Sequence, residues 1–522
     1  MSEGALIARI HGSVAELPAS EWDALTLGGN PFVTHAFLSA MEQSGSVGGH
    51  SGWTPAPIVI EEAGGRLAAA LPAYLKQHSQ GEYVFDHAWA DAWHRAGGSY
   101  YPKLQIAVPF TPATGPRLLT RRSELALPLL SAAETLCRDN GLSSAHATFI
   151  DPDQVPVFEQ AGWLLREDIQ FHWENRGYAS FDDFLAALSS RKRKDLRKER
   201  AKAQEGVEIR AMRGDDITQR HWDAFWAFYQ DTGSRKWGRP YLTREAFTLL
   251  GRTMGESILL VMAFLDGEPV AGALNFIGAE ALYGRYWGAV VDKPFLHFEL
   301  CYYQAIEAAI ALGLSRVEAG AQGGHKLARG YEPVRTVSAH YIVHEGLRAA
   351  IADYLEQERA GIARDQIWLD ERSPFRKDDL CGSGGLAHRG RQPFARPALR
   401  FGDLAGGHLV SYFAAAGGGF LMAGHGREVE PLVRFDQIAT DTVAARGIGD
   451  PKVEISGAVT LRSGGQTFCD QHVLRREING GSGREAILFD PGSFHLPLPP
   501  VFRPDNRSSD SDTVEQSRSR FG

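Results

Sequence analysis

The chain is poor in cysteine, in long apolar runs and in positive charge, and each shortage excludes a class of protein. Its four cysteines, Cys137, Cys301, Cys381 and Cys469, lie far apart, with no CxxC pair and no histidine spacing typical of zinc ligands. This usage favours a reducing compartment and predicts no metal site. The longest uninterrupted apolar run covers residues 258–265, which is too short to span a membrane.

The amino terminus, MSEGALIARIHGS, has neither the basic segment nor the continuous apolar core of a signal peptide. We therefore expect a cytoplasmic protein with no transmembrane segment. The net charge of −8 argues against a generally basic surface for nucleic acid, so any phosphate site should be a local patch. The motifs GxSxG and HExxH and the kinase signatures are also missing from the sequence, which leaves those enzyme classes without support.

Two segments of the chain resemble each other. Residues 56–75 and 258–277 each predict a strand, a short turn and a second strand. Downstream of each, a helical pattern stops at Gly-Leu-Ser and passes into a strand, with Gly141 and Gly313 at the expected helix ends. The repeated order predicts a duplicated α/β domain, although helix-glycine-strand is common enough for coincidence to stay open.

The region after residue 380 has a different composition. It holds 22 of the 57 glycines and a single lysine, Lys452, and its last twenty residues are typical of disorder. We expect a first domain over residues 1–170, a second over 171–380, and a glycine-rich, partly disordered tail over 381–522.

The glycine-rich stretch EAGAQGGHKLARGYEP, residues 318–333, ends in a histidine and a lysine side by side. Its spacing fits neither a P-loop nor a dinucleotide fingerprint. Small residues after a strand would let a ligand approach the backbone closely. His325 could then exchange a proton and Lys326 could hold an anion. The alternative, a plain turn whose His and Lys face solvent, stays open.

A basic segment and an aromatic pair are further candidates. The segment RKRKDLRKER, residues 191–200, would suit phosphate if it forms a helix, with Arg191, Lys194 and Arg197 as contacts. A solvated helix face is the alternative. Tyr286 and Trp287 lie on a predicted strand beside the second hairpin and could line a groove, whereas most other aromatic residues should belong to the core.

With these segments in view, the chain resembles the FemAB-like N-acyltransferases of the GNAT superfamily, which are associated with peptidoglycan biosynthesis or recognition. The resemblance covers about residues 20–378. It rests on the segments NPFVTHAFLSAMEQSGSV, FDHAWADAW, YYPKLQIAVPFTPATGPRLL, RKRKDLRKER, YWG, FLHFELCYYQAIEAAIALGL and AGAQGGHKLARGYEP. The tail after Cys381 has no counterpart.

The resemblance implies tandem GNAT-like domains, each a mixed, mostly antiparallel sheet with flanking helices. It implies transfer of an acyl or aminoacyl group to an amine, such as a peptidoglycan precursor, with no tightly bound cofactor. The donor, acyl-CoA or aminoacyl-tRNA, stays undecided. The only segment near the R-x-x-G-x-[GA] turn of acyl-CoA enzymes is RGIGDP at Arg446, which lies in the tail and lacks the spacing.

The resemblance also assigns roles. We expect His325, Glu318 and Tyr286 to be catalytic, and we expect substrate to contact the side chains Lys326, Arg329, Tyr331, Gln322, Trp287, Arg191, Lys194 and Arg197. The family usually has an acidic residue where this chain has Gly324. If that carboxylate is the proton acceptor, His325 or Glu318 must replace it, or the chain is a non-catalytic binding protein. A tRNA-binding accessory role is a third reading, and the sequence gives no oligomeric state.

Overall fold

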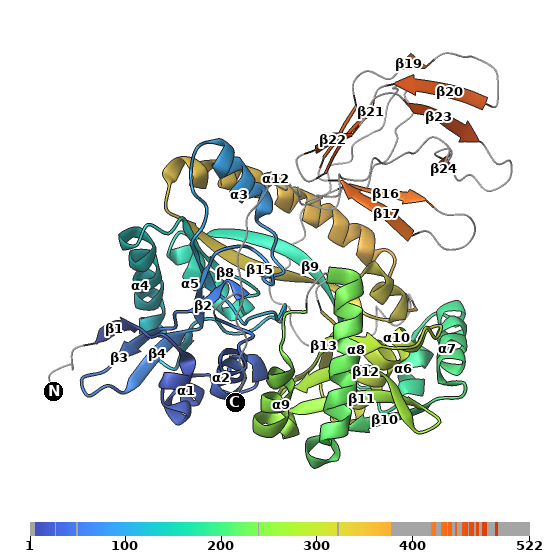
Figure 1. The fold of residues 1–522 in the computed structure, drawn as a ribbon, viewed down its shortest axis with the longest axis horizontal. Helices are drawn as coiled ribbons and strands as arrows, with labels where there is room; N and C mark the ends of the chain where they lie inside the picture. Colours follow the sequence, from blue (N-terminus) through green and yellow to red (C-terminus); the bar gives the residue numbers. More distant parts are fainter. Residues whose placement is uncertain are drawn as a thin grey trace, which may run out of the picture. The chain divides into compact units, whose positions relative to one another are not determined.

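The computed structural model describes residues 6–26, 28–48, 51–237, 240–320 and 323–376, and short strands between residues 419 and 488 (Figure 1). Contacts divide the chain into two compact units, Met1–Leu399 and Arg400–Gly522. Residue 170, the expected end of the first domain, lies inside a strand of the first unit. That boundary therefore stays a prediction.

The first half of the larger unit is built on a bent hairpin. Its strands are β1 (Ile7–Ile10), β2 (Trp53–Pro55), β3 (Ile58–Glu61), β4 (Leu67–Leu71), β5 (Ala73–Lys76), β6 (Lys103–Ile106), β7 (Leu119–Thr120) and β8 (Ser144–Ala147). Its main helices are α1 (Ala19–Leu25), α2 (His35–Gln43), α3 (His87–Arg95), α4 (Ala126–Asp139) and α5 (Val155–Gln160). After α4, Gly141 takes a φ of 67°, a left-handed conformation that is common where helices end and that favours glycine, and β8 then pairs parallel with β6.

The second half repeats this order. It contains β10 (Glu208–Met212), α8 (Gln219–Trp237), α9 (Arg244–Met254), β11 (Ile258–Leu265), β12 (Glu268–Ile277), β13 (Ala281–Ala289), α10 (Leu296–Phe298), the π-helical turn η8 (Glu299–Tyr303), α11 (Gln304–Ala311) and β14 (Arg316–Glu318). Asp266 and Gly267, at φ 51° and 80°, form the two-residue turn that suits the twist of a hairpin. Both predicted hairpins and both helix-glycine-strand units are confirmed, and the larger unit is a tandem of two α/β halves.

Two long strands are exchanged between the halves. Strand β9 (Leu164–Glu174) follows the first half but pairs with β14 of the second, and β15 (Glu332–Ile342) follows β14 but pairs with β8 of the first. The two strands also pair with each other, from Glu332 opposite His172 to His340 opposite Leu164. Figure 1 shows β9 and β15 between the two halves. The result is one eleven-stranded sheet.

The halves also share side-chain packing. One core cluster contains Trp22, Phe32 and Phe37 of the first half together with Phe225 and Phe276 of the second. The 26-residue helix α12 (Glu345–Asp370) then packs on both exchanged strands. The two halves therefore share a hydrophobic core cluster and do not pack as independent units.

The second unit is described only as short strands. They are β16 (Gly419–Ala423), β17 (Glu430–Phe435), β18 (Gln437–Thr440), β19 (Ala444–Ala445), β20 (Lys452–Gly457), β21 (Val459–Ser463), β22 (Gln466–Phe468), β23 (His472–Glu477) and β24 (Ala486–Leu488). The last twenty residues, whose composition predicts disorder, lie outside the described residues, so this expectation stays a prediction. Within the described part of the chain, no helix is both long and apolar enough to cross a membrane.

A fully buried arginine, Arg117, fixes the conformation of the loop at residues 113–117 of the first half. The Arg117 guanidinium donates to the carbonyl oxygens of Ala113, Gly115, Pro116 and Thr148 at 2.9–3.1 Å. Because its donors match backbone acceptors, the charge is solvated by peptide dipoles. This accounts physically for the segment PFTPATGPRLL.

We expect Arg117→Met to lower the free energy of unfolding by roughly 3 kcal/mol or more, because several buried carbonyls lose their donor. Urea unfolding followed by circular dichroism measures the loss. Arg121→Met is the matched control, since Arg121 is exposed and reaches one carbonyl, that of Ala24. Equal stability of the two variants would contradict the assigned role of Arg117.

Candidate functional site

The sheet opens between β13 and β14. The two strands pair in parallel only from Ala281 to Tyr283, opposite Arg316 to Glu318, after which β14 ends and β13 continues to Ala289. A bulge in β13 coincides with the opening: Leu274 pairs with Tyr286 and Asn275 with Gly284, so Arg285 is the extra residue. The backbone of β13 beyond Tyr283 therefore lacks a neighbour on its β14 side among the described strands.

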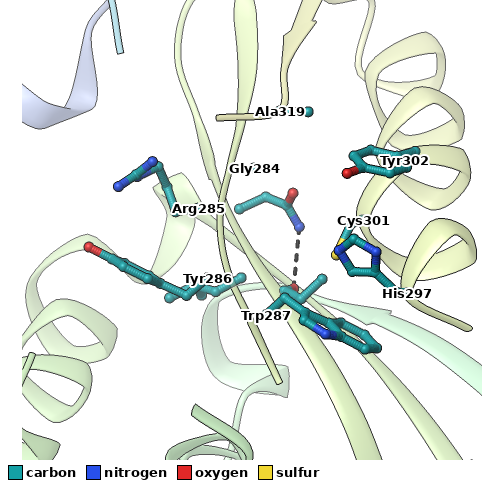
Figure 2. A pocket seen from close by; sticks show the side chains of 11 residues that line it. Gly284, Arg285, Tyr286, Trp287, His297, Cys301, Tyr302 and Ala319 are labelled. Carbon is teal, nitrogen blue, oxygen red and sulfur yellow. Dashed lines mark hydrogen bonds between the residues drawn. The ribbon is translucent and has the colours of Figure 1, made fainter. Parts of the chain in front are cut away.

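A pocket of about 100 Å³ occupies this opening (Figure 2). Figure 2 shows Arg285 and Tyr286 on one side of β13 and His297, Cys301 and Tyr302 on the other. The remaining lining residues are Ala273, Leu274, Asn275, Gly284, Trp287 and Ala319. The pair Tyr286 and Trp287, chosen from sequence, thus lines a pocket at the end of the glycine-rich strand. Burial raises the pKa of Tyr286 to about 12, so its hydroxyl stays protonated.

Glu318 is the last residue of β14 and is almost fully buried. Its Oε1 accepts from Arg316 Nε at 3.0 Å, whereas Oε2 has no hydrogen-bond partner and lies 3.9 Å from His172 Nε2. Burial lowers the pKa of His172. The exchange of β9 brings the two residues together, because His172 is the cross-strand neighbour of Glu318. Glu318 Oε2 is thus a buried acceptor that no described residue satisfies.

The glycine-rich stretch continues as the short helix η9 (Gly324–Arg329). His325 is exposed, and its Nε2 lies 2.9 Å from the hydroxyl of Tyr302, a residue that lines the pocket. Lys326 is buried, and its ammonium donates to the Gly320 carbonyl at 2.8 Å. Burial lowers the pKa of Lys326 to about 8. Its predicted contact with an anion stays a prediction.

Two other predicted substrate residues of this stretch are held inside the protein. Arg329 donates to both oxygens of Glu199 at 3.0 Å, and its guanidinium lies 3.4 Å from the ring centre of Phe298. Tyr331 is fully buried. Gln322 lies outside the described residues. Because Glu199 belongs to helix α7 (Ser190–Gln204) and Phe298 to α10, these contacts fix η9 against both helices and hold His325 beside the pocket.

The basic segment forms helix α7 (Ser190–Gln204), as predicted. Leu196 and Ala203 are its buried residues and set the side that packs on the protein. Arg191, Lys194 and Arg197 are exposed, and Arg197 pairs with the exposed Asp182 at 3.1 Å. Their predicted role in substrate binding stays a prediction.

A second hollow lies between α7, Phe295 and η9. Its volume is about 410 Å³, and its lining consists of Lys192, Asp195, Leu196, Lys198, Glu199, Lys202, Phe295, Ala328 and Arg329. Three lysines and one arginine outweigh two carboxylates, so the hollow favours an anion. The lysines that line it are not those chosen from sequence. The spacing of Leu196 and Ala203 could have identified the correct helix face.

The first half has a buried charged cluster that sequence reasoning missed. Lys103 is fully buried and donates to Ser79, Glu82 and Asp86 at 2.5–2.8 Å. Burial raises the pKa of Glu82 to about 7, while Lys103 holds the pKa of Asp86 below its usual range despite burial. These contacts tie the loop 79–86 to β6. We therefore assign a structural role to the segments FDHAWADAW and YYPKLQ.

Comparison with known proteins identifies a family. The model of the FemAB-like family, described as peptidoglycan biosynthesis/recognition, matches residues 13–377. None of the curated proteins compared with the chain matches it. The groups of three or more His, Cys, Asp or Glu that a metal would need are not found among the described residues.

Several solved structures are similar at low identity. A tandem GNAT protein from the clavulanic acid biosynthesis pathway is 13% identical, with 65% of this chain and 99% of that chain covered and a TM-score of 0.37. FemX is 12% identical, with 64% and 98% covered and a TM-score of 0.42. L-PGS from Bacillus licheniformis is 10% identical, with 65% and 96% covered and a TM-score of 0.41.

The buried lysine gives a pH test of the site. In the folded protein the pKa of Lys326 is about 8, whereas an unfolded chain has a lysine pKa of about 10.4. Between these values the unfolded chain binds more protons, so the stability of the protein relative to Lys326→Met should rise with pH, by roughly 2–3 kcal/mol.

Denaturant unfolding at a series of pH values from about 7 to 10 measures this difference. Lys194→Met is the control, because it makes the same substitution at an exposed lysine. A pH-independent difference for Lys326→Met would show that the ammonium is not desolvated.

Proposed function

The chain belongs to the FemAB-like family, and from this premise we propose that it is an N-acyltransferase. It moves an acyl or aminoacyl group onto an amine, for which a peptidoglycan precursor is the favoured acceptor and the cytoplasm the favoured location. The observation that carries the proposal is the pocket where β13 and β14 part, which Ala319, the residue after Glu318, lines and which Tyr302 joins to His325.

Acyl transfer to an amine needs a polarised carbonyl, a base for the amine and a proton for the leaving group. In the proposed arrangement the N–H groups of β13 that β14 leaves unpaired bind the acyl oxygen. Such preorganised backbone donors stabilise developing negative charge without rearrangement. The small pocket beside them then holds the rest of the acyl group.

Glu318 is the proposed base. Its Oε2 is buried and has no hydrogen-bond partner, and Arg316 fixes the other oxygen. His325 is the second proton-transfer group, since its exposed ring reaches the Tyr302 hydroxyl at 2.9 Å. Because Tyr302 lines the pocket and contacts His325, the pair offers a proton a route to and from the reacting atoms.

The hollow lined by Lys192, Lys198 and Lys202 is the proposed site for the phosphate-bearing part of the donor. Arg329 lines this hollow and belongs to the same short helix as His325, so η9 lies between the two sites. Both acyl-CoA and aminoacyl-tRNA carry phosphate, and this site does not choose between them. The mass of a molecule that co-purifies with the protein would make the choice.

Once the donor is known, we expect Glu318→Gln to lower the transfer rate by about 10²- to 10⁴-fold, because the amide cannot accept the proton. His325→Ala should lower it by a smaller factor. Glu280→Gln is the matched control, since Glu280 also pairs with Arg316 but is exposed. Full activity of both Glu318→Gln and His325→Ala would refute the assignment.

A non-catalytic binding protein is the second candidate, and Gly324 is the observation that favours it. A Cβ added at this position meets no atom within 4 Å, so a larger side chain can begin there beside His325. For an enzyme, we expect measurable turnover by the natural chain and a several-fold faster rate for Gly324→Glu. Donor binding without turnover in the natural chain, with turnover appearing only in Gly324→Glu, would instead show a binding protein that has lost its base.

A further inference from the structure

Asn275 is a polar side chain buried at the bulge of the open strand pair. It is only 1% exposed and lines the pocket between β13 and β14. Its Nδ2 donates to the carbonyl oxygens of Leu259 at 3.2 Å and Ala273 at 3.3 Å. These contacts fix the orientation of the amide, because a flipped side chain would point its oxygen at two carbonyl oxygens.

The oxygen of the same amide is left as an acceptor. Oδ1 is buried and accepts no hydrogen bond from any described residue. It faces the position of Gly284, where an added Cβ would lie 3.4 Å from it, and Gly284 also lines the pocket. A buried acceptor without a donor is unfavourable, so the site gains free energy from a ligand that supplies an N–H or O–H group.

The size of the pocket limits the ligand. A volume of about 100 Å³ holds three or four heavy atoms, because a water molecule in the liquid occupies about 30 Å³. A two- or three-carbon acyl group fills this space, and a longer chain would extend out of it. The glycine at 284 is part of this limit, since any side chain there would approach Oδ1.

The charges around the pocket limit the ligand further. Its described lining includes Arg285 and His297 and no carboxylate. The carboxylate of Glu318 is held by Arg316 and faces His172. An ammonium in the pocket would therefore be desolvated without a contacting counter-charge, which is costly. A neutral donor, a hydroxyl or an amide N–H, avoids that cost.

We propose that this pocket selects a short acyl group that carries a neutral hydrogen-bond donor beside its carbonyl, and that Asn275 is the specificity-determining residue. That the ligand is an acyl group rests on the proposed function, whereas the preference for a neutral donor is a property of the pocket itself. A hydroxyacyl group of two or three carbons meets every requirement.

Three small amides test the selectivity without any acyl transfer. Lactamide carries a hydroxyl, propionamide carries none, and alaninamide carries an ammonium at about pH 6.5. Binding is measured by ligand-observed NMR titration of the full chain. We expect lactamide to bind about tenfold more tightly than either of the others, because the pocket's acceptor needs a neutral donor.

Variants assign the effect to this residue. Asn275→Leu should remove the preference for lactamide, and the isosteric Asn275→Asp should move it to alaninamide, because the new carboxylate compensates an ammonium. Gly284→Ala, which places a methyl group against Oδ1, should weaken lactamide binding without disturbing the fold. Asn140→Leu, at an exposed asparagine, is the control that should keep the natural preference.

Equal binding of lactamide and propionamide by the natural chain would overturn the inference, as would unchanged lactamide binding by Gly284→Ala. Selective binding without transfer to any amine would refute the proposed function and leave this inference standing. Transfer of acyl groups without this selectivity would refute the inference alone.

Discussion

The antiparallel pairing of β9 with β15 is the constraint on which the rest of the structure depends. Each strand completes the sheet of the opposite half, so neither half has its full sheet alone. The pairing also brings Gln170 of β9 to the loop that Arg117 shapes, where its amide donates to the Pro112 carbonyl at 3.0 Å. The two duplicated halves are thereby joined through β9 and β15. The candidate site lies beside these two strands.

The same exchange accounts for the open strand pair. Strand β14 is only three residues long, because the chain leaves it after Glu318 to form η9 and then returns as β15 beside β9. Strand β13 therefore keeps free backbone groups along its later part, and the bulge at Arg285 directs that side chain to the Phe110 carbonyl of the other half. The free backbone donors and the small pocket therefore both lie where β14 ends, as a consequence of this topology.

Local features of the sequence predicted much of the fold, and long-range features could not be predicted. The hairpin turn at Asp266-Gly267 and the glycine ends at residues 141 and 313 depend on backbone conformations that neighbouring residues dictate. The partnership of His172 with Glu318 depends instead on strand exchange between distant segments, which no short pattern contains. The unpaired oxygen of Asn275 likewise depends on a bulge in the partner strand. On α7 the helix was predicted correctly, but the lysines that line the hollow follow from the packing of Leu196.

The central claim is that the donor binds in the pocket between β13 and β14, and Cys301 reports on it directly. Cys301 lines that pocket, whereas Cys137 is buried and its pKa is raised by burial to about 12, so its thiol reacts slowly. The decisive measurement is the rate at which a small alkylating reagent modifies Cys301, followed by peptide mass spectrometry with and without a bound donor. The account predicts that a donor able to support transfer slows this modification in proportion to its occupancy. An unchanged rate at saturating donor would place the donor elsewhere and contradict the account.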